Sequence, residues 1–121
     1  RGCLETYISG SGLEKQYKER TGKKLSAKEI FSARTKIAIE IKKSFYDAYG
    51  RGIANICNII DPDIIVVGGG LSNEPTLYSL GIESVRKHFF SDQLETKIVR
   101  NSLGDSAGVL GAAILSENLV F

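Results

Sequence analysis

Residues 60–70 read IDPDIIVVGGG, and this stretch decides the fold class of the chain. The continuous run of β-branched residues at 64–67 is typical of a strand that is buried on both faces of a parallel or mixed sheet. Pro62 ends the preceding helix, because the residue before a proline is pushed out of helical geometry. Three glycines end the strand, and a helical pattern follows them. This alternation predicts an α/β organisation.

A long apolar stripe precedes this stretch and predicts one helix over about residues 35–60. Apolar or small residues recur there at steps of three or four, and four further residues broaden the same face. We therefore expect a long and well-buried helix. The stripe consists of Ile37, Ile41, Phe45, Ala48, Gly52, Ile56 and Ile60, broadened by Ala38, Tyr49, Ile53 and Cys57.

Three shorter helices are expected before residue 35. The segment 3–8 reads as a short helix that breaks near residues 10–12, because Gly10 and Gly12 are costly inside a helix. A second helix is expected from 11 to 21, with Gly22 as its left-handed stop. Ser26 and Glu29 fit a capping box, which predicts a third helix through residue 31.

Beyond the glycines, the pattern predicts a helix, a strand and a last helix. The first helix begins around residues 73–75, and a strand is expected over 96–100. Asp105 is a suitable cap for the last helix. The apolar faces are expected to hold Leu77, Leu80, Val85 and Phe89 in the first helix, and Ala107, Leu110, Ala113 and Ile114 in the last.

The chain is expected to be a fragment. Two strands are too few for a self-sufficient sheet, so further strands are expected upstream. The sequence also contains no methionine, so Arg1 is not expected to be a translation start.

The composition is that of an ordinary soluble globular domain, with 42% hydrophobic and 25% charged residues among 121. One domain over residues 1–121 with a modest core is expected. A net charge of +2 does not favour a nucleic acid or a membrane as partner. The sequence contains no long apolar run and no signal peptide. Cys3 and Cys57 lie far apart, so we expect no disulfide framework and a reducing, cytoplasmic setting.

The glycine triplet Gly68, Gly69 and Gly70 is the first candidate site. Glycines between a strand and a helix let the backbone approach a phosphate or a nucleotide closely. A tight turn between strand and helix would use glycines equally well, so the triplet leaves both interpretations open. The spacing matches neither a Walker A loop nor the Rossmann fingerprint.

Other positions carry weaker signals. Residues 104–108 form a second glycine-flanked helix start, but Asp105 would place negative charge where an anion should sit, so capping is favoured. Cys3 alone cannot define a zinc site, and a lone Glu5 is normally a surface residue. Cys57 lies on an apolar face, which favours core packing. His88 is expected in the last turn of its helix, where a cation complements the dipole, with no catalytic role.

Three motifs together resemble the ROK family (repressors, open reading frames and kinases). Residues 2–10, GCLETYISG, resemble the second half of the family signature CxCGxxGCxE. Residues 60–72 look like the family's strand and glycine turn, and residues 104–113 resemble its closing motif. The match covers essentially the whole chain in the right order and spacing.

The resemblance implies an actin-like, ribonuclease-H-like fold, in which two α/β domains close over a cleft and this chain is the carboxy-terminal portion. It also implies an ATP-dependent hexose kinase that transfers the γ-phosphate of MgATP to a sugar hydroxyl. Cys3 then matches the last cysteine of a structural zinc site in the full-length parent. Glu5 matches a glutamate that hydrogen-bonds sugar hydroxyls, a task that suits a carboxylate. The glycine triplet matches the loop against the nucleotide.

Several parts of the family pattern would precede Arg1. They are the phosphate loop, the catalytic aspartate and the remaining zinc ligands, a histidine and two cysteines. That aspartate would be the general base on the sugar hydroxyl. The chain by itself is therefore expected to be inactive and to bind no zinc.

The wording of the motifs places the chain nearest to bacterial fructokinases or mannokinases, with N-acetylglucosamine kinases next. A rival interpretation is a sugar-sensing ROK repressor whose DNA-binding domain lies outside this chain. A third is a stand-alone interaction domain derived from the same fold. In the isolated chain, the apolar faces of the first and last helices would have lost their neighbours, which predicts a homodimer.

Overall fold

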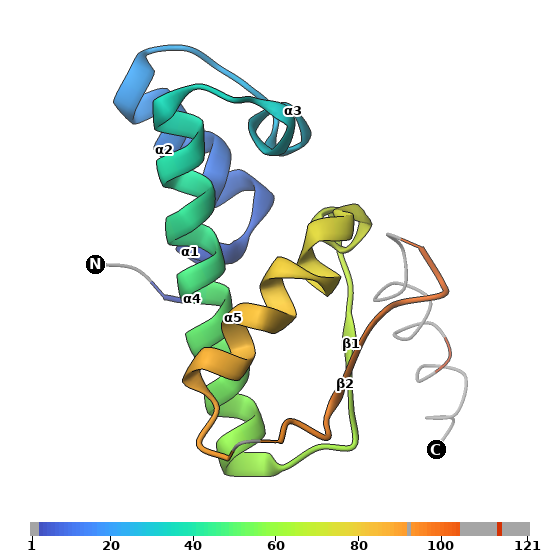
Figure 1. The fold of residues 1–121 in the computed structure, drawn as a ribbon. Coiled ribbons are helices and arrows are strands. Elements are labelled where there is room, and N and C mark those ends of the chain that lie inside the picture. The colour runs from blue at the N-terminus through green and yellow to red at the C-terminus, as the bar shows by residue number, and fades with distance from the viewer. Residues whose placement is uncertain (1–2, 92, 105–113, 115–121) are drawn as a thin grey trace.

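The computed structural model describes residues 3–91, 93–104 and 114. These residues form a helix-rich α/β structure, as the sequence predicts. Figure 1 shows α2 and α3 against the amino-terminal half of α4, and α5 and the two strands beside its carboxy-terminal half. In chain order the elements are α1 (Glu5–Ile8), α2 (Gly10–Thr21), α3 (Ala27–Ser32), α4 (Lys36–Ile60), β1 (Ile64–Val67), two short 3₁₀ helices, η1 (Gly70–Asn73) and η2 (Pro75–Tyr78), α5 (Leu80–His88) and β2 (Lys97–Arg100).

The long helix α4 begins and ends where the sequence predicts. Thr35 caps its start, because its Oγ1 accepts a hydrogen bond from the Ala38 amide at 3.3 Å. Asp61 ends the helix in the left-handed conformation with a φ of 49°, and Pro62 follows. Helices α1, α2, α3 and α5 all pack against α4, so this helix forms the centre of the core.

The buried stripe of α4 is rotated relative to the prediction. Ile56 and Ile60, which were expected on the buried face, are 39% and 68% exposed. The periodicity identifies residues that share a face, but the positions of the neighbouring helices decide which part of that face is covered. The buried side chains of α4 are Ala38, Ile41, Phe45, Tyr49, Ile53, Ala54 and Cys57.

The break between the first two helices lies at Ser9, not at residues 10–12. Ser9 has an extended backbone, and its Oγ accepts a hydrogen bond from the Gly12 amide at 3.0 Å, which caps α2. Gly12 is a close-approach position, since a Cβ there would lie 2.2 Å from the Thr6 carbonyl oxygen. The cost of glycine in the first turn of α2 is therefore offset by tight packing against α1.

The predicted stops and caps of the next helices are confirmed. Gly22 ends α2 with a φ of 70°. Ser26 and Glu29 form both halves of a capping box at the start of α3. The Glu29 carboxylate accepts hydrogen bonds from the Ser26 amide and hydroxyl at 2.7 and 2.6 Å, and these bonds lower the pKa of Glu29.

The segment after the glycines folds differently from the prediction. One helix was expected from residues 73–75, but η1 and η2 come first and α5 begins only at Leu80. Ser79 interrupts the helix with φ −121° and ψ −80°. Leu80, expected on the apolar face, is 48% exposed, whereas Leu77 and Val85 are buried as predicted.

The two strands pair in parallel, with Ile64 opposite Lys97 and Val67 opposite Arg100. The prediction that β1 is buried on both faces is wrong for the described residues. Ile65 and Val67 pack against the core, but Ile64 and Val66 on the other face are 51% and 58% exposed. Side chains alternate between the faces of a strand, and the described helices cover one face only.

The last predicted helix, with Asp105 as its cap, lies outside the described residues except for Ile114, which is helical and 58% exposed. Within the described part of the chain, no helix is both long and apolar enough to cross a membrane.

Candidate functional site

The glycine triplet forms an exposed turn directly after β1. Gly69 has a φ of 78°, a conformation that favours glycine. A Cβ added at Gly69 or Gly70 would meet no atom within 4 Å, so the outer side of the turn is open. The turn therefore offers bare backbone to a ligand, and its conformation requires glycine at one of the three positions.

The inner side of the turn is fixed by hydrogen bonds around Ser72, which is 1% exposed. The Asn101 amide Nδ2 donates to the Val67 carbonyl and to the Ser72 Oγ, both at 3.3 Å. The Tyr78 hydroxyl donates to the Ser72 carbonyl at 2.8 Å. Arg100 of β2 donates to the Asn73 side chain. Residues of β2 and η2 thus hold the turn in one conformation.

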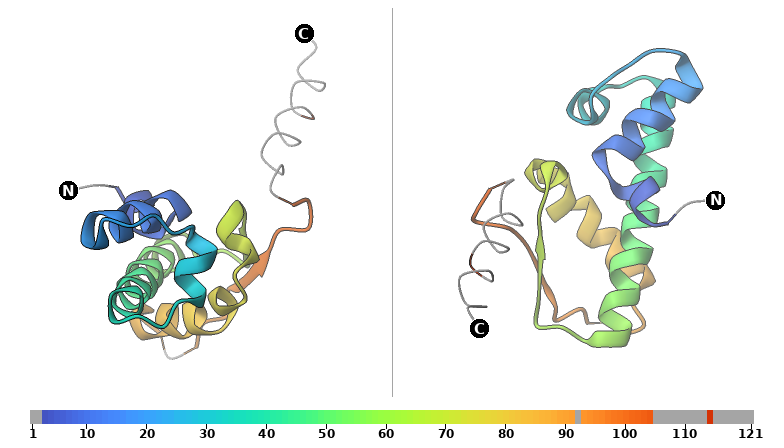
Figure 2. Two further views of the ribbon diagram at one scale, coloured as in Figure 1. Left: turned by 90° about the horizontal axis from the view of Figure 1, so that it is seen from above. Right: turned by 180° about the vertical axis from the view of Figure 1, so that it is seen from behind.

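A groove of about 820 Å³ lies between this turn and the amino-terminal helices. Figures 1 and 2 show α3 beside the segment that follows β1. Residues far apart in the sequence therefore form the two walls of one groove. The lining residues are Gly10, Ser11, Glu14, Ser26, Ala27, Lys28, Phe31 and Ser32 on one wall, and Gly70, Leu71, Asn73, Glu74 and Pro75 on the other.

The groove combines polar groups with an apolar floor. Glu14 and Glu74 contribute carboxylates, Lys28 contributes one cation, and Phe31 and Leu71 contribute apolar surface. One oxygen of Glu14 is occupied, because it accepts a hydrogen bond from the Ala27 amide at 3.0 Å and joins α2 to α3. An apolar surface with a few placed polar groups is typical of a site for a flat ligand with polar substituents.

Glu5 is exposed in the first turn of α1 and borders a second, smaller hollow of about 230 Å³. This hollow is also lined by Ser9, Gly12 and Lys15. Ser11 lines both the small hollow and the groove at the glycine turn, so the two adjoin. The hollow at Glu5 thus shares one lining residue with the groove at the glycine turn, although more than sixty residues separate Glu5 from the glycines in sequence.

Cys3 and Cys57 are both free thiols with different surroundings. Cys57 is 1% exposed, so the predicted core packing is confirmed. Cys3 is exposed, and the residues that the structure describes contain no group of three or more metal-binding side chains. One thiolate does not fit a structural zinc, which takes about four ligands. The role of Cys3 as a zinc ligand therefore stays a prediction.

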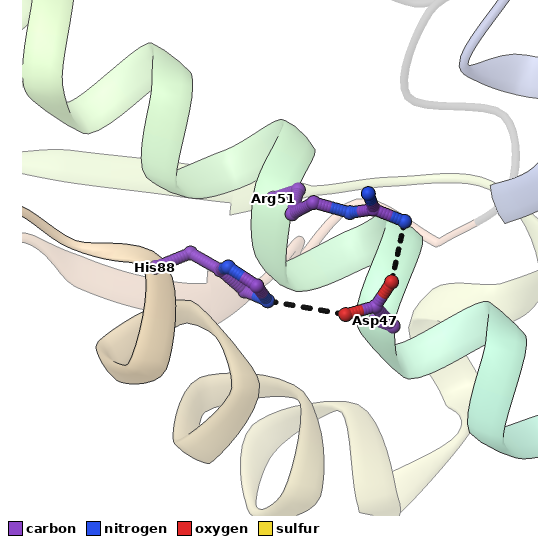
Figure 3. Close-up of polar contacts among 3 residues, drawn as sticks. All are labelled: Asp47, Arg51 and His88. Atoms are coloured by element: carbon purple, nitrogen blue, oxygen red, sulfur yellow. Dashed lines mark hydrogen bonds and ion pairs between the residues drawn. The ribbon is translucent and has the colours of Figure 1, made fainter.

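Figure 3 shows a polar cluster that the sequence analysis missed. His88 lies in the last turn of α5, as predicted, and its Nε2 is 3.2 Å from Oδ1 of Asp47 on α4. The other oxygen of Asp47 accepts from Arg51, one turn further along α4. The i,i+4 spacing of Asp47 and Arg51 was a readable signal. The cluster joins α4 to α5 at a partly exposed position, and we assign it a structural role.

Comparison with known proteins relates nearly the whole chain to one protein family. The sequence model of the ROK family matches residues 1–118. An N-acetyl-D-glucosamine kinase of Mannheimia succiniciproducens is 41% identical over 118 residues, which are 95% of this chain and 39% of that protein. An N-acetyl-D-glucosamine kinase of Histophilus somni is 38% identical over the same shares. The chain thus spans well under half the length of the relatives that it matches.

Solved structures agree on the fold. A ROK family glucokinase from Streptomyces griseus, in complex with glucose and AMPPNP, superposes with a TM-score of 0.79 at 25% identity, over 98% of this chain and 45% of that one. A ROK hexokinase from Thermus thermophilus gives a TM-score of 0.78 at 26% identity, over 95% and 40% of the two chains. The predicted fold class, part of an actin-like ATPase fold, is confirmed.

Proposed function

The chain belongs to the ROK family, and on that premise we propose that it is the carboxy-terminal part of a sugar kinase. The full-length parent would transfer the γ-phosphate of MgATP to a sugar hydroxyl. One observation carries the proposal: the groove at the glycine turn adjoins the hollow at Glu5 through Ser11. Two ligands that exchange a phosphoryl group must lie side by side, and the lining residue Ser11 that the two hollows share supports this arrangement.

The groove is assigned to the nucleotide. The exposed turn at Gly68, Gly69 and Gly70 allows close approach of phosphates to backbone, where side chains would block them. The larger volume and the apolar surface of Phe31 and Leu71 suit a purine base. Gly70 of the triplet lines the groove and is then part of a binding site, so the alternative of a merely tight turn is the weaker interpretation.

The smaller hollow is assigned to the sugar, with Glu5 as the residue that holds it. An ionised carboxylate accepts hydrogen bonds from two neighbouring hydroxyls, and such charge-assisted bonds are stronger than neutral ones. Glu5 lies beside the nucleotide groove and not inside it, which fits this division of roles.

The described residues supply binding groups, and the general base is assigned to a part of the parent outside this chain. Phosphoryl transfer depends on positioning and on charge stabilisation around the γ-phosphate. The chain alone is therefore proposed to be inactive. Cys3 is proposed to contribute one ligand to a structural zinc in the parent, with its other ligands outside this chain.

N-acetyl-D-glucosamine is the first sugar to test. The relatives named above are N-acetyl-D-glucosamine kinases, whereas the motif wording placed fructokinases and mannokinases first. These kinase relatives give no support to the repressor interpretation. We further propose that this chain forms a homodimer and that the parent has a cytoplasmic setting, the latter in keeping with two free cysteines.

The test is ADP release by the full-length parent with MgATP and a panel of sugars. The panel contains N-acetyl-D-glucosamine, glucose, mannose and fructose. We expect turnover with one of them, and Glu5→Ala should lower kcat/KM by about 10- to 100-fold, the effect of losing hydrogen bonds to a charged acceptor. Glu83→Ala is the matched control, because Glu83 is an exposed glutamate on α5 that pairs with Lys87, and both residues lie outside the two hollows.

The results separate the interpretations. Turnover that Glu5→Ala reduces and Glu83→Ala preserves supports the kinase assignment and names the sugar. A folded parent that binds a sugar but releases no ADP with any sugar would refute the kinase assignment and favour a sugar-sensing repressor.

A further inference from the structure

Both walls of the groove are attached to the same turn of α4. Lys42, Phe45 and Tyr46 contact α3 or the segment after the glycine turn. The two walls come from residues 10–32 and 70–75, which are far apart in the sequence. The width of the groove therefore depends on one helical turn that does not line it.

The α3 wall is held by a cation and by aromatic contacts. The Lys42 ammonium donates hydrogen bonds to the carbonyl oxygens of Phe31 at 3.0 Å and Ala33 at 2.8 Å, which closes the end of α3. The Phe31 ring packs edge-on against Phe45, with centroids 5.3 Å apart, and against Tyr46 at 6.2 Å. Phe31 itself lines the groove.

The opposite wall is held by a chain of hydroxyls. The Tyr46 hydroxyl contacts the Thr76 Oγ1, and that hydroxyl is 2.5 Å from Oε1 of Glu74. A carboxylate only accepts, so Thr76 donates to Glu74 and Tyr46 donates to Thr76. The Thr76 amide also donates to the same Glu74 oxygen at 3.3 Å. The direction of each hydrogen bond in this chain of hydroxyls is thus defined.

The surroundings keep the first hydroxyl of the chain protonated. Burial raises the pKa of Tyr46, the hydrogen bond to Thr76 lowers it by less, and the nearby Glu74 carboxylate adds a still smaller rise. Tyr46 therefore acts as a donor at any physiological pH.

We propose that Tyr46 and Thr76 are positioning residues for the nucleotide groove. This inference rests on the nucleotide assignment made above. Because Thr76 donates to Oε1, the Glu74 carboxylate is held in one orientation. Because Tyr46 contacts both Thr76 and the Phe31 ring, the Glu74–Pro75 wall is held at a fixed distance from α3. An adenine nucleotide enters a groove whose walls are already in place, so it does not lose the free energy of ordering them. The Glu5 hollow shares no residue with this chain of hydroxyls, so sugar binding does not depend on it.

The experiment measures steady-state ADP release by the full-length parent, varying MgATP and sugar separately. Tyr46→Phe removes one hydroxyl and keeps the ring that packs on Phe31. Thr76→Val removes the second hydroxyl at nearly the same volume. Each variant should raise the KM for MgATP about three- to tenfold, the usual worth of one hydrogen bond, with kcat and the KM for sugar within about twofold.

Two further variants and one control exclude a general loss of structure. Thr76→Ser keeps the hydroxyl and should restore the KM for MgATP. The double variant Tyr46→Phe/Thr76→Val should cost little more than either single one, because both changes break the same link. Tyr17→Phe is the matched control, since Tyr17 is a mostly buried tyrosine of α2 outside the groove lining.

The outcomes are distinct. An unchanged KM for MgATP in Tyr46→Phe and Thr76→Val overturns the inference, and so does an equal change in the sugar KM. If the unsubstituted parent releases no ADP with any sugar, the kinase assignment fails by itself. The dissociation constant of MgADP, measured by titration calorimetry, then decides: weakening in both variants supports the inference, and no weakening, or no binding of MgADP by the parent, overturns it.

Discussion

Gly50 and Gly52 lie two residues apart on α4, and alanine should have opposite effects at the two positions. Replacing a helical glycine by alanine stabilises a helix by about 1 kcal/mol when nothing obstructs the new methyl group. At Gly50, the added Cβ would lie 2.2 Å from the Ser84 Oγ and 2.7 Å from the Ser84 carbonyl carbon and oxygen. At Gly52, it would lie 2.5 Å from a methyl carbon of Leu4.

The identity of the obstructing atom decides the sign. Ser84 blocks Gly50 with its backbone on α5, so α4 and α5 must move apart, and overpacking of this kind costs about 1–3 kcal/mol. A contact with backbone belongs at the upper end of that range, which leaves a net loss of about 2 kcal/mol for Gly50→Ala after the gain in helix propensity. Leu4 is 41% exposed and its methyl groups can rotate away, so Gly52→Ala should raise stability by up to about 1 kcal/mol.

The assay is urea unfolding of the 121-residue chain, followed by circular dichroism at 222 nm. Gly50→Ala should lower the midpoint with an unchanged slope, which marks a loss of stability and not of cooperativity. Gly50→Ala/Ser84→Gly removes the Oγ contact but keeps the backbone contact, so it should recover only part of the loss. Equal midpoints for Gly50→Ala and Gly52→Ala would refute the argument that a rigid backbone contact limits the approach of α5 to α4.

Two further predictions concern side chains of α4. Burial raises the pKa of Tyr49 to about 12, and its hydroxyl has no hydrogen-bond partner among the described residues. An unfolded tyrosine titrates near pH 10, so the stability linked to this proton is full below about pH 10 and is lost as pH rises toward 12. Tyr49→Phe should therefore reduce alkaline unfolding above about pH 10. It should also raise the free energy of unfolding at pH 7 by about 1 kcal/mol, because it removes an unpaired polar atom. A variant less stable than the unsubstituted chain across pH 7–11 would contradict this. Lys42→Met should cost about 1–3 kcal/mol, because the Phe31 and Ala33 carbonyls lose their donor, while Lys42→Arg should keep most of the stability; equal midpoints for the two in a thermal melt would contradict the capping role.

Much of the local structure could be predicted because local chemistry decides it. The Ser26–Glu29 capping box, the Gly22 stop and the end of α4 before Pro62 each depend on residues within one turn of one another. For the candidate site, the motifs selected Glu5 and the glycine triplet, and their roles stay predictions. Nothing in their spacing indicated that Ser11 would join the two sites, or that Glu74 would line the groove.

The sequence by itself determined the α/β class, the order of the described α-helices and strands, and the family resemblance, since these depend on residue type and short-range period. The tertiary structure alone decided which side of α4 is buried, that one face of β1 is open, and that α4 braces both walls of the groove. Ile56 and Val66 have the same apolar character as Ile53 and Val67, yet the former are exposed and the latter more buried. The physical reason is that a side chain is buried only when another surface packs against it. The chemistry of a residue determines its own surface but not which surface packs against it.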